Sequence, residues 1–236
     1  HGHSQNVSVR SDWNPRSTVC AVYGKGGNGA EGHGNHDAGQ VCIDSYGERL
    51  ITDPGSPPGY PADFFSENRY EYYNASVRGH NVLCFDKTEM RRQKTDSATV
   101  VSSAFEDAKG GWWQIDLTPL YDSVKRVFRT VVYLAPSTVV VCDSAELDDE
   151  SETSLRWHTI NEPSWSPDGH YNVSTPGAAV DCLTTSVGRT PLKCDLQHHE
   201  YVEPYNRFRL GDIFEERQEP YLEFLTTAKE ISLLSL

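Results

Sequence analysis

Short runs of Val, Ile, Thr and aromatic residues recur along the chain and are separated by turn-forming residues. Between Lys125 and Tyr133, charged and apolar residues partly alternate, as they do in a strand with one face in water. No segment keeps a helical period, and only residues 117–123, where Pro119 can begin a helix, indicate a helical turn. Strands are therefore predicted at 18–23, 40–44, 48–52, 81–85, 98–105, 112–117, 124–135, 138–143 and 155–159, with several weaker candidates later.

The regular spacing of these turns is typical of an antiparallel β-sandwich. A chain of 236 residues is within the range of one all-β domain, and its 37% hydrophobic content supplies a core. We therefore predict an all-β fold with a single domain over residues 1–236. The acidic run at 146–152 is expected to be a solvated hairpin tip, and Gly24 to Gly29 a flexible turn without the spacing of a phosphate loop.

The net charge of −13 opposes binding to nucleic acid and to anionic membranes. No run of eighteen apolar residues exists that would span a membrane. An anionic substrate would need a local group of cations. One candidate group lies within 26 positions, and solvated strand charges are the alternative interpretation: Arg69, Arg78, Lys87, Arg91, Arg92 and Lys94.

Cysteine usage and glycosylation motifs indicate an exported protein, secreted or periplasmic. The six cysteines contain no CxxC pair, and their even number suits an oxidising compartment. Glycosylation sequons occur at Asn6, Asn74 and Asn172. Cys182 and Cys194 could close one loop. The chain opens with His1 instead of Met, so we expect a mature product or a fragment that has lost any signal peptide.

Three potential metal ligands stand next to predicted strands. His36 precedes the strand at 40–44, Asp53 follows the strand at 48–52, and His80 precedes the strand at 81–85. If these strands pair in one sheet, their ends can converge, and imidazole with carboxylate suits zinc. Two alternatives remain: histidines hydrogen-bonded in a core, and a rival pair at His198 and His199.

The order of several motifs resembles a known family. "VRSDWNPRSTVCAVYGKG" is followed by a His-rich segment ending in "HDAG", then by "YGERLITDPG", "YYNASVRGHNVLCFD", "WWQIDLTPLYDSVKRVFRTVVYL" and "STVVVCDSAE". Over residues 8–160 this succession resembles the C-terminal β-sandwich of the heparinase II/III-like polysaccharide lyases, whereas 161–236 offers no motif to match. The resemblance implies a supersandwich-like fold that lacks the family's upstream (α/α) toroid of helices.

The resemblance also implies a zinc ion held by His36, Asp53 and His80. The family spaces two histidines by one residue, whereas this chain has "HGNH", so either His33 or His36 can be the ligand. We choose His36 for its spacing to Asp53. His33 then resembles the family's histidine that faces the substrate. Asn35 or Asp37 would accept a hydrogen bond and fix the imidazole tautomer.

Further roles follow from the same resemblance. Tyr60 lies where the family places a tyrosine near the substrate, with Tyr70 as its rival. His33 and Tyr60 are therefore the predicted catalytic residues. Arg69, Tyr70 and Arg78 are the predicted substrate-binding residues, because a planar guanidinium can bind carboxylate or sulfate. The alternative for Arg69 and Arg78 is a cross-strand salt bridge.

The implied reaction is β-elimination in a uronate-containing acidic polysaccharide. In the family most of the catalytic groups lie on the helical toroid, so this chain alone is expected to be inactive and to need that domain as a partner. Two other functions stay open. One is a non-catalytic, metal-stabilised module that binds glycan or serves a structural role. The other is copper binding by His1 in "HGH", as in lytic polysaccharide monooxygenases.

Overall fold

Strands make up most of the described chain, as the alternation predicts. The computed structural model describes residues 5–14, 18–27, 34–56, 59–91, 96–188, 190–205 and 218–236. His1, His33, Arg92 and Lys94 lie outside these ranges. The elements are β1 (Val7–Arg10), β2 (Ala21–Gly24), β3 (Val41–Ser45), β4 (Glu48–Ile51), the 3-10 turns η1 (Glu67–Glu71) and η2 (Val77–Gly79), β5 (Leu83–Phe85), β6 (Thr99–Glu106), β7 (Gly110–Asp116), the 3-10 turn η3 (Thr118–Leu120), β8 (Val124–Leu134), β9 (Thr138–His158), β10 (Ser164–Trp165), β11 (His170–Ser174), β12 (Ala179–Ser186), β13 (Lys193–Glu200) and β14 (Gln218–Ser235).

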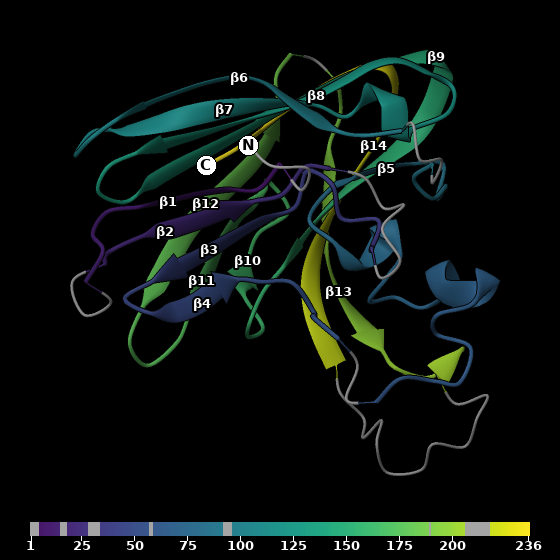
Figure 1. The fold of residues 1–236 in the computed structure, drawn as a ribbon, viewed down its shortest axis with the longest axis horizontal. Helices are drawn as coiled ribbons and strands as arrows, with labels where there is room; N and C mark the ends of the chain where they lie inside the picture. Colours follow the sequence, from purple (N-terminus) through teal and green to yellow (C-terminus); the bar gives the residue numbers. More distant parts are fainter. Residues whose placement is uncertain are drawn as a thin grey trace.

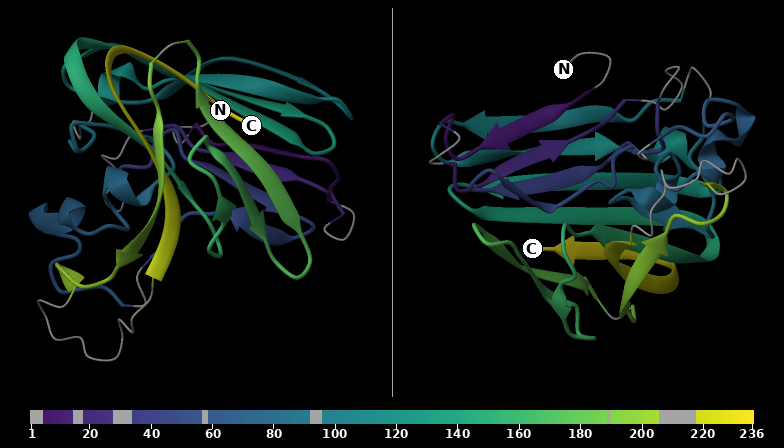
Figure 2. Two further views of the ribbon diagram at one scale, coloured as in Figure 1. Left: turned by 180° about the vertical axis from the view of Figure 1, so that it is seen from behind. Right: turned by 90° about the horizontal axis from the view of Figure 1, so that it is seen from below.

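Two antiparallel sheets face each other, which confirms the predicted all-β sandwich. The smaller sheet has the order β1-β2-β3-β4. The larger has the order β10-β11-β12-β14-β9-β8-β7-β6, with β13 paired to β14 and β5 to β9. Figure 1 shows the smaller sheet beneath β6 to β8, and the right view of Figure 2 shows it lying across the larger sheet. The predicted helical turn at 117–123 is present as η3, with Pro119 in its first turn.

The long strands β9 and β14 form the centre of the larger sheet. They pair from Tyr221↔His158 to Ser235↔Val141, with a bulge between Ala228 and Glu230. The prediction of a hairpin tip at 146–152 is wrong, because this acidic run lies inside β9. Glu146, Ser151 and Glu152 pair with β14, and residues 147–150 form the β9 side of the bulge. The exposed side chains of the run point away from the core, so the charges are solvated although the backbone continues as a strand.

The core lies between the two sheets. Along β8 the side chains of Val127, Val131 and Tyr133 are buried, whereas their neighbours are not. Trp113 of β7 is fully buried against β2, where a Cβ on Gly24 would lie 2.7 Å from its indole ring. Only a residue without a side chain permits this approach between the sheets.

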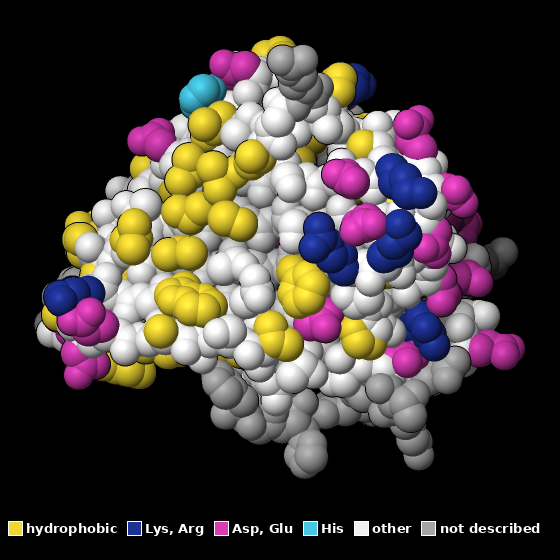
Figure 3. All heavy atoms as spheres, turned by 90° about the horizontal axis from the view of Figure 1, so that it is seen from above, with side chains coloured by type: hydrophobic (Ala, Val, Ile, Leu, Met, Phe, Trp, Pro, Cys, Tyr) yellow, Lys and Arg dark blue, Asp and Glu magenta, His cyan; other side chains and the backbone are white. Residues whose placement is uncertain are grey.

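The outer face of the larger sheet is largely uncharged at its centre. One row of paired residues crosses β6, β7, β8 and β9 through Ala104, Trp112, Val132 and Val140. Figure 3 looks onto this side of the molecule and shows hydrophobic side chains gathered on one part and mixed charges on another. The Lys and Arg side chains seen there lie among Asp and Glu side chains.

Two expectations about modification change with the structure. All six cysteines are free, so the predicted Cys182–Cys194 loop closure is wrong. Their strands, β12 and β13, pair with opposite ends of β14. The Asn74 side chain is buried and donates hydrogen bonds to Gly55 O and Tyr201 Oη, so this sequon serves the fold and cannot accept a glycan in the folded chain. None of the described helices has the length and apolarity to span a bilayer.

A buried ion pair connects the larger sheet to two loops. The Arg129 guanidinium on β8 is fully buried and binds the Asp143 carboxylate of β9 at two points, 2.7 and 2.9 Å. Its Nη1 also donates to Gly39 O at 2.7 Å and to Asn81 O. All three guanidinium nitrogens therefore donate to an acceptor in the core. Removal of either charge of the ion pair leaves the other unpaired there.

We predict that Arg129→Met lowers the free energy of unfolding by about 3–5 kcal/mol, because Asp143 then remains as an uncompensated buried charge. Urea unfolding followed by tryptophan fluorescence measures the change. Lys125→Met is the control on the same strand, because Lys125 pairs with Glu146 at the surface, and its midpoint should match the wild type. Equal midpoints for the two variants would contradict the structural role of Arg129.

Candidate metal and substrate site

His36 lies in the turn before β3 and its imidazole ring is buried. The ring stacks on Tyr70 with centroids 3.6 Å apart, and the backbone N–H of His36 donates to Ala75 O at 2.9 Å. Its Nδ1 lies 2.7 Å from Oε2 of Glu89. Its Nε2 is buried and has no hydrogen-bond partner. The acceptor beside His36 is thus Glu89, not the predicted Asn35 or Asp37. Those two residues bind Arg69 and Lys25 instead.

Asp53 and His80 meet, as the sequence predicts. Asp53 follows β4 in the Asp-Pro-Gly turn, where Gly55 has a φ of +68° and donates its N–H to Oδ1 at 2.7 Å. Oδ2 of Asp53 lies 3.0 Å from Nδ1 of His80. His80 is fully buried at the end of η2, and its Nε2 also has no hydrogen-bond partner.

The two partners perturb each other's titration. Burial raises the pKa of the Asp53 carboxyl, but the charge and hydrogen bond of His80 outweigh it and lower the pKa to about 2. Burial lowers the pKa of His80, and the charge and hydrogen bond of Asp53 outweigh that effect, so this pKa lies above its usual 6.5. The pair is therefore favoured as carboxylate and imidazolium when no other ligand is bound.

The donor chemistry of these residues fits zinc. His36 and His80 each hold a carboxylate on Nδ1 and leave Nε2 buried and unpaired, which is the arrangement that carboxylates impose on metal-binding histidines. The predicted three-residue set is not assembled, however. Asp53 contacts His80, whereas His36 contacts Glu89, and no three His, Cys, Asp or Glu side chains in the described ranges are grouped closely enough to hold an ion.

A second buried histidine network adjoins this pair. His158, at the end of β9, lies with Nε2 2.6 Å from the Tyr73 hydroxyl and Nδ1 2.8 Å from Oδ1 of Asn81. Burial and then the charge of Arg156 lower the pKa of His158 well below 6.5, so the ring is neutral. This network was not predicted from the sequence. The only signal for it was the Asn that follows His80.

The rival pair at His198 and His199 is divided between two faces of β13. His199 stacks on Tyr73 with centroids 3.6 Å apart, whereas His198 lies 3.3 Å from the exposed Glu162 carboxylate. Successive side chains of a strand point to opposite faces, so these two cannot bind one ion together.

An aromatic wall stands beside the Asp-Pro-Gly turn. Tyr60 and Phe65 are 51% and 46% exposed, and their ring centroids are 4.9 Å apart. Both line a small pocket of about 90 Å³ that also contains the polar side chains of Asn35, Ser56, Arg69 and Asn74. The Tyr60 hydroxyl donates to Ser56 Oγ at 3.1 Å. The pocket therefore combines exposed rings with amide and hydroxyl groups, a composition suited to a polar ligand with an apolar face.

The predicted substrate-binding residues differ in exposure. Arg69 is buried, lies over the Phe64 ring, and donates to Gly34 O and Asn35 Oδ1 at 3.0 and 2.7 Å. Tyr70 covers His36 and donates to Gly34 O at 3.3 Å. The side chain of Arg78 is 42% exposed, with Nε 3.9 Å from Oε1 of Glu89. Arg78 is thus the more accessible of the two cations, and His33 lies outside the described residues.

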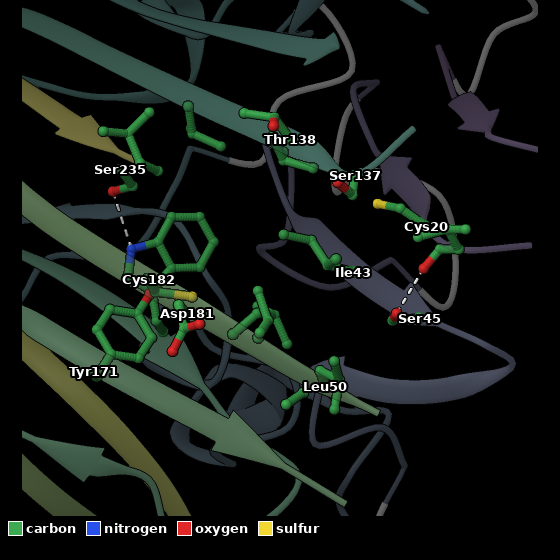
Figure 4. Close-up of a pocket in the computed structure, with 18 of the residues that line it drawn as sticks. Cys20, Ile43, Ser45, Leu50, Ser137, Thr138, Tyr171, Asp181, Cys182 and Ser235 are labelled. Carbon is green, nitrogen blue, oxygen red and sulfur yellow. Dashed lines mark hydrogen bonds between the residues drawn. The ribbon is translucent and has the colours of Figure 1, made fainter. Parts of the chain in front are cut away.

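An apolar cavity of about 320 Å³ lies elsewhere, between the sheets (Figure 4). Its wall includes Ile43, Leu50, Tyr171 and Cys182, and none of the predicted site residues. The candidate chemistry therefore gathers beyond the end of β4, not in this cavity.

Comparison with known proteins identifies the fold and the family. The family model described as "Heparinase II/III-like, C-terminal" matches residues 16–214. A search of curated proteins finds no match. A heparan sulfate lyase HepC structure from Pedobacter heparinus superposes with a TM-score of 0.76 at 14% identity, covering 99% of this chain and 35% of the other. A structure of heparinase III gives a TM-score of 0.74 at 13% identity, with the same coverage.

The similarity to the solved structures is limited to the fold and to part of their length. At such low identity the solved structures establish the fold, and this chain spans about a third of the length of each. The motifs lie within residues 8–160, and the family match continues past residue 160 to residue 214. The resemblance seen in the motif order is confirmed. The chain belongs to the heparinase II/III-like, C-terminal family.

Proposed function

We propose that this chain is the part of a polysaccharide lyase that binds zinc and forms one wall of the cleft for a uronate-containing polysaccharide. The observation that carries the proposal is the pair of buried histidines, His36 and His80, each with a carboxylate on Nδ1 and an unpaired Nε2. A buried imidazole nitrogen without a partner is costly unless a ligand occupies it. Family membership supports zinc as that ligand. Asp53 would complete the set, and its carboxylate would then leave Nδ1 of His80 to reach the ion.

The proposed reaction is β-elimination, which needs a base for the proton α to the carboxylate, a stabiliser for the enolate, and an acid for the leaving oxygen. Tyr60 is the exposed phenol of this wall and serves as base or acid. Zinc, when bound, supplies positive charge that fixes the chain segments around it. Phe65 offers a ring face to the sugar, and Arg78 offers a cation to its carboxylate.

The partners and location follow from the same proposal. The helical toroid domain of the family supplies the opposite wall and most of the catalytic groups, so this chain alone is inactive. The enzyme acts outside the cytoplasm, secreted or periplasmic, where acidic polysaccharide is found. A module that binds glycan without cleaving it has the same residues, and only turnover separates the two functions.

Zinc content gives the first prediction. The chain purified without chelator should hold about one zinc per molecule, as a site of two histidines and a carboxylate requires. His80→Ala should lose it, because a ligand nitrogen is removed. Elemental analysis measures both, and His198→Ala is the control, since His198 lies at the surface. Absence of zinc from the wild type, or full zinc in His80→Ala, would contradict the site.

The pH dependence of zinc binding is a further prediction. The raised pKa of His80 means that the metal-free chain holds a proton on this ring above pH 6.5. Zinc must displace that proton, so its apparent affinity should fall with each decrease in pH, and the fall should begin above pH 6.5. Titration with a competing chelator at several pH values measures it. Histidines titrate in the range from about pH 6 to about pH 8. A zinc affinity that stays constant over this range would exclude His80 as a ligand.

Lyase activity tests the reaction itself. Joined to a helical toroid domain of this family, the chain should release unsaturated uronate product, which ultraviolet absorbance detects. Tyr60→Phe should lower the rate by about 10²- to 10⁴-fold, because it removes the phenolic proton carrier. Tyr46→Phe is the matched control, an exposed tyrosine on the β3–β4 turn. Binding of polysaccharide without product would favour the glycan-binding module.

A further inference from the structure

The carboxylate of Glu89 contacts both histidine-bearing segments. Oε2 lies 2.7 Å from Nδ1 of His36 and accepts the N–H of Val77 at 2.9 Å. Val77 begins η2, and His80 directly follows η2 as its C-cap. One carboxylate oxygen therefore holds the ring of one histidine and the first residue of the short turn that carries the other.

Glu89 is itself held in place by its neighbours in the chain. The side chain of Met90 is buried in the main core, and the N–H of Arg91 donates to Leu120 O at 2.7 Å. On the other side, Thr88 N donates to Phe85 O at the end of β5. The carboxylate thus projects from a segment tied to the sandwich at both ends.

An ionised carboxylate can only accept hydrogen bonds, so it selects the imidazole form with its proton on Nδ1. The lone pair then lies on Nε2, which in His36 is buried and without a partner. The Tyr70 ring stacked on His36 prevents rotation of the imidazole that would exchange the two nitrogens. From a different loop, Asp53 likewise places a carboxylate oxygen 3.0 Å from Nδ1 of His80.

We propose that Glu89 is a positioning residue: it holds His36 in the Nδ1–H form with Nε2 free, and it keeps the His36 segment in register with the turn that carries His80. Glu89 carries no role in the zinc set implied by the family resemblance. The inference deepens the proposed function at its metal site, but the state of the His36 ring can be measured on the metal-free chain.

The first test is the tautomer of His36. Nitrogen NMR of the histidine rings in the metal-free chain, at a pH where they are neutral, should show the Nδ1–H form for His36. Glu89→Ala should shift this ring toward the Nε2–H form. Glu152→Gln is the control, a carboxylate beside β5 that pairs with the exposed Lys87. An Nε2–H form in the wild type would overturn the proposal without any variant.

The second test is zinc affinity by chelator competition. Glu89→Gln keeps the shape of the side chain and an oxygen for Val77 N–H, and it should weaken zinc by about 10- to 100-fold, as loss of such a partner does. Glu89→Gln carries this test even if Glu89→Ala fails to fold. Affinity within twofold of the wild type, together with an unchanged tautomer, would overturn the role of Glu89. If the wild type binds no zinc, the metal proposal fails, and the NMR result alone decides on Glu89.

Discussion

The buried guanidinium of Arg129 is the interaction on which the site depends. Its charge is balanced by Asp143 in the core, and its remaining N–H group reaches two loop carbonyls, Gly39 and Asn81. Gly39 lies three residues after His36, and Asn81 directly follows His80. A single cation thus fixes both histidine segments to the same strand pair, β8 and β9. Because the ion pair is enclosed, solvent cannot replace its hydrogen bonds, and movement of either loop would leave a buried donor without its acceptor.

Asn81 extends this network to the smaller sheet. Its amide donates to Val41 O of β3 and to Thr52 O at 2.9 and 2.8 Å, and its oxygen accepts from the backbone and ring of His158. The ends of β3, β4 and β9 therefore converge on one side chain. Buried polar groups here are satisfied almost throughout, and the Nε2 atoms of His36 and His80 are among the few exceptions. In a folded core such exceptions indicate a missing ligand or a functional group.

The strands could be predicted from the sequence because alternation and turn residues are local signals. The meeting of Asp53 and His80 could be predicted as well, since both stand beside strand ends. The expected reason is wrong, however, because β4 belongs to the smaller sheet and β5 to the larger one. Glu89 and the Tyr73–His158 pair could not be predicted. Their partners lie 53 and 85 positions away, and a surface-type acid or an aromatic residue gives no local sign of such contacts. The acidic run of β9 misled for a related reason: solvated charges are equally common on hairpin tips and on the wet face of a long strand.

The burial of the two histidines limits what a metal there can do. His36 is 3% exposed and His80 is fully buried, so neither ring can touch a sugar. Tyr60 and Phe65, by contrast, are about half exposed beyond the same turn. An ion bound at the histidines would therefore act by holding the segments from which the aromatic wall projects, and the contacts with polysaccharide would fall to that wall. Loss of such an ion should disturb the positions of Tyr60 and Phe65 before it changes any chemistry, because a site is only as well ordered as the residues that support it.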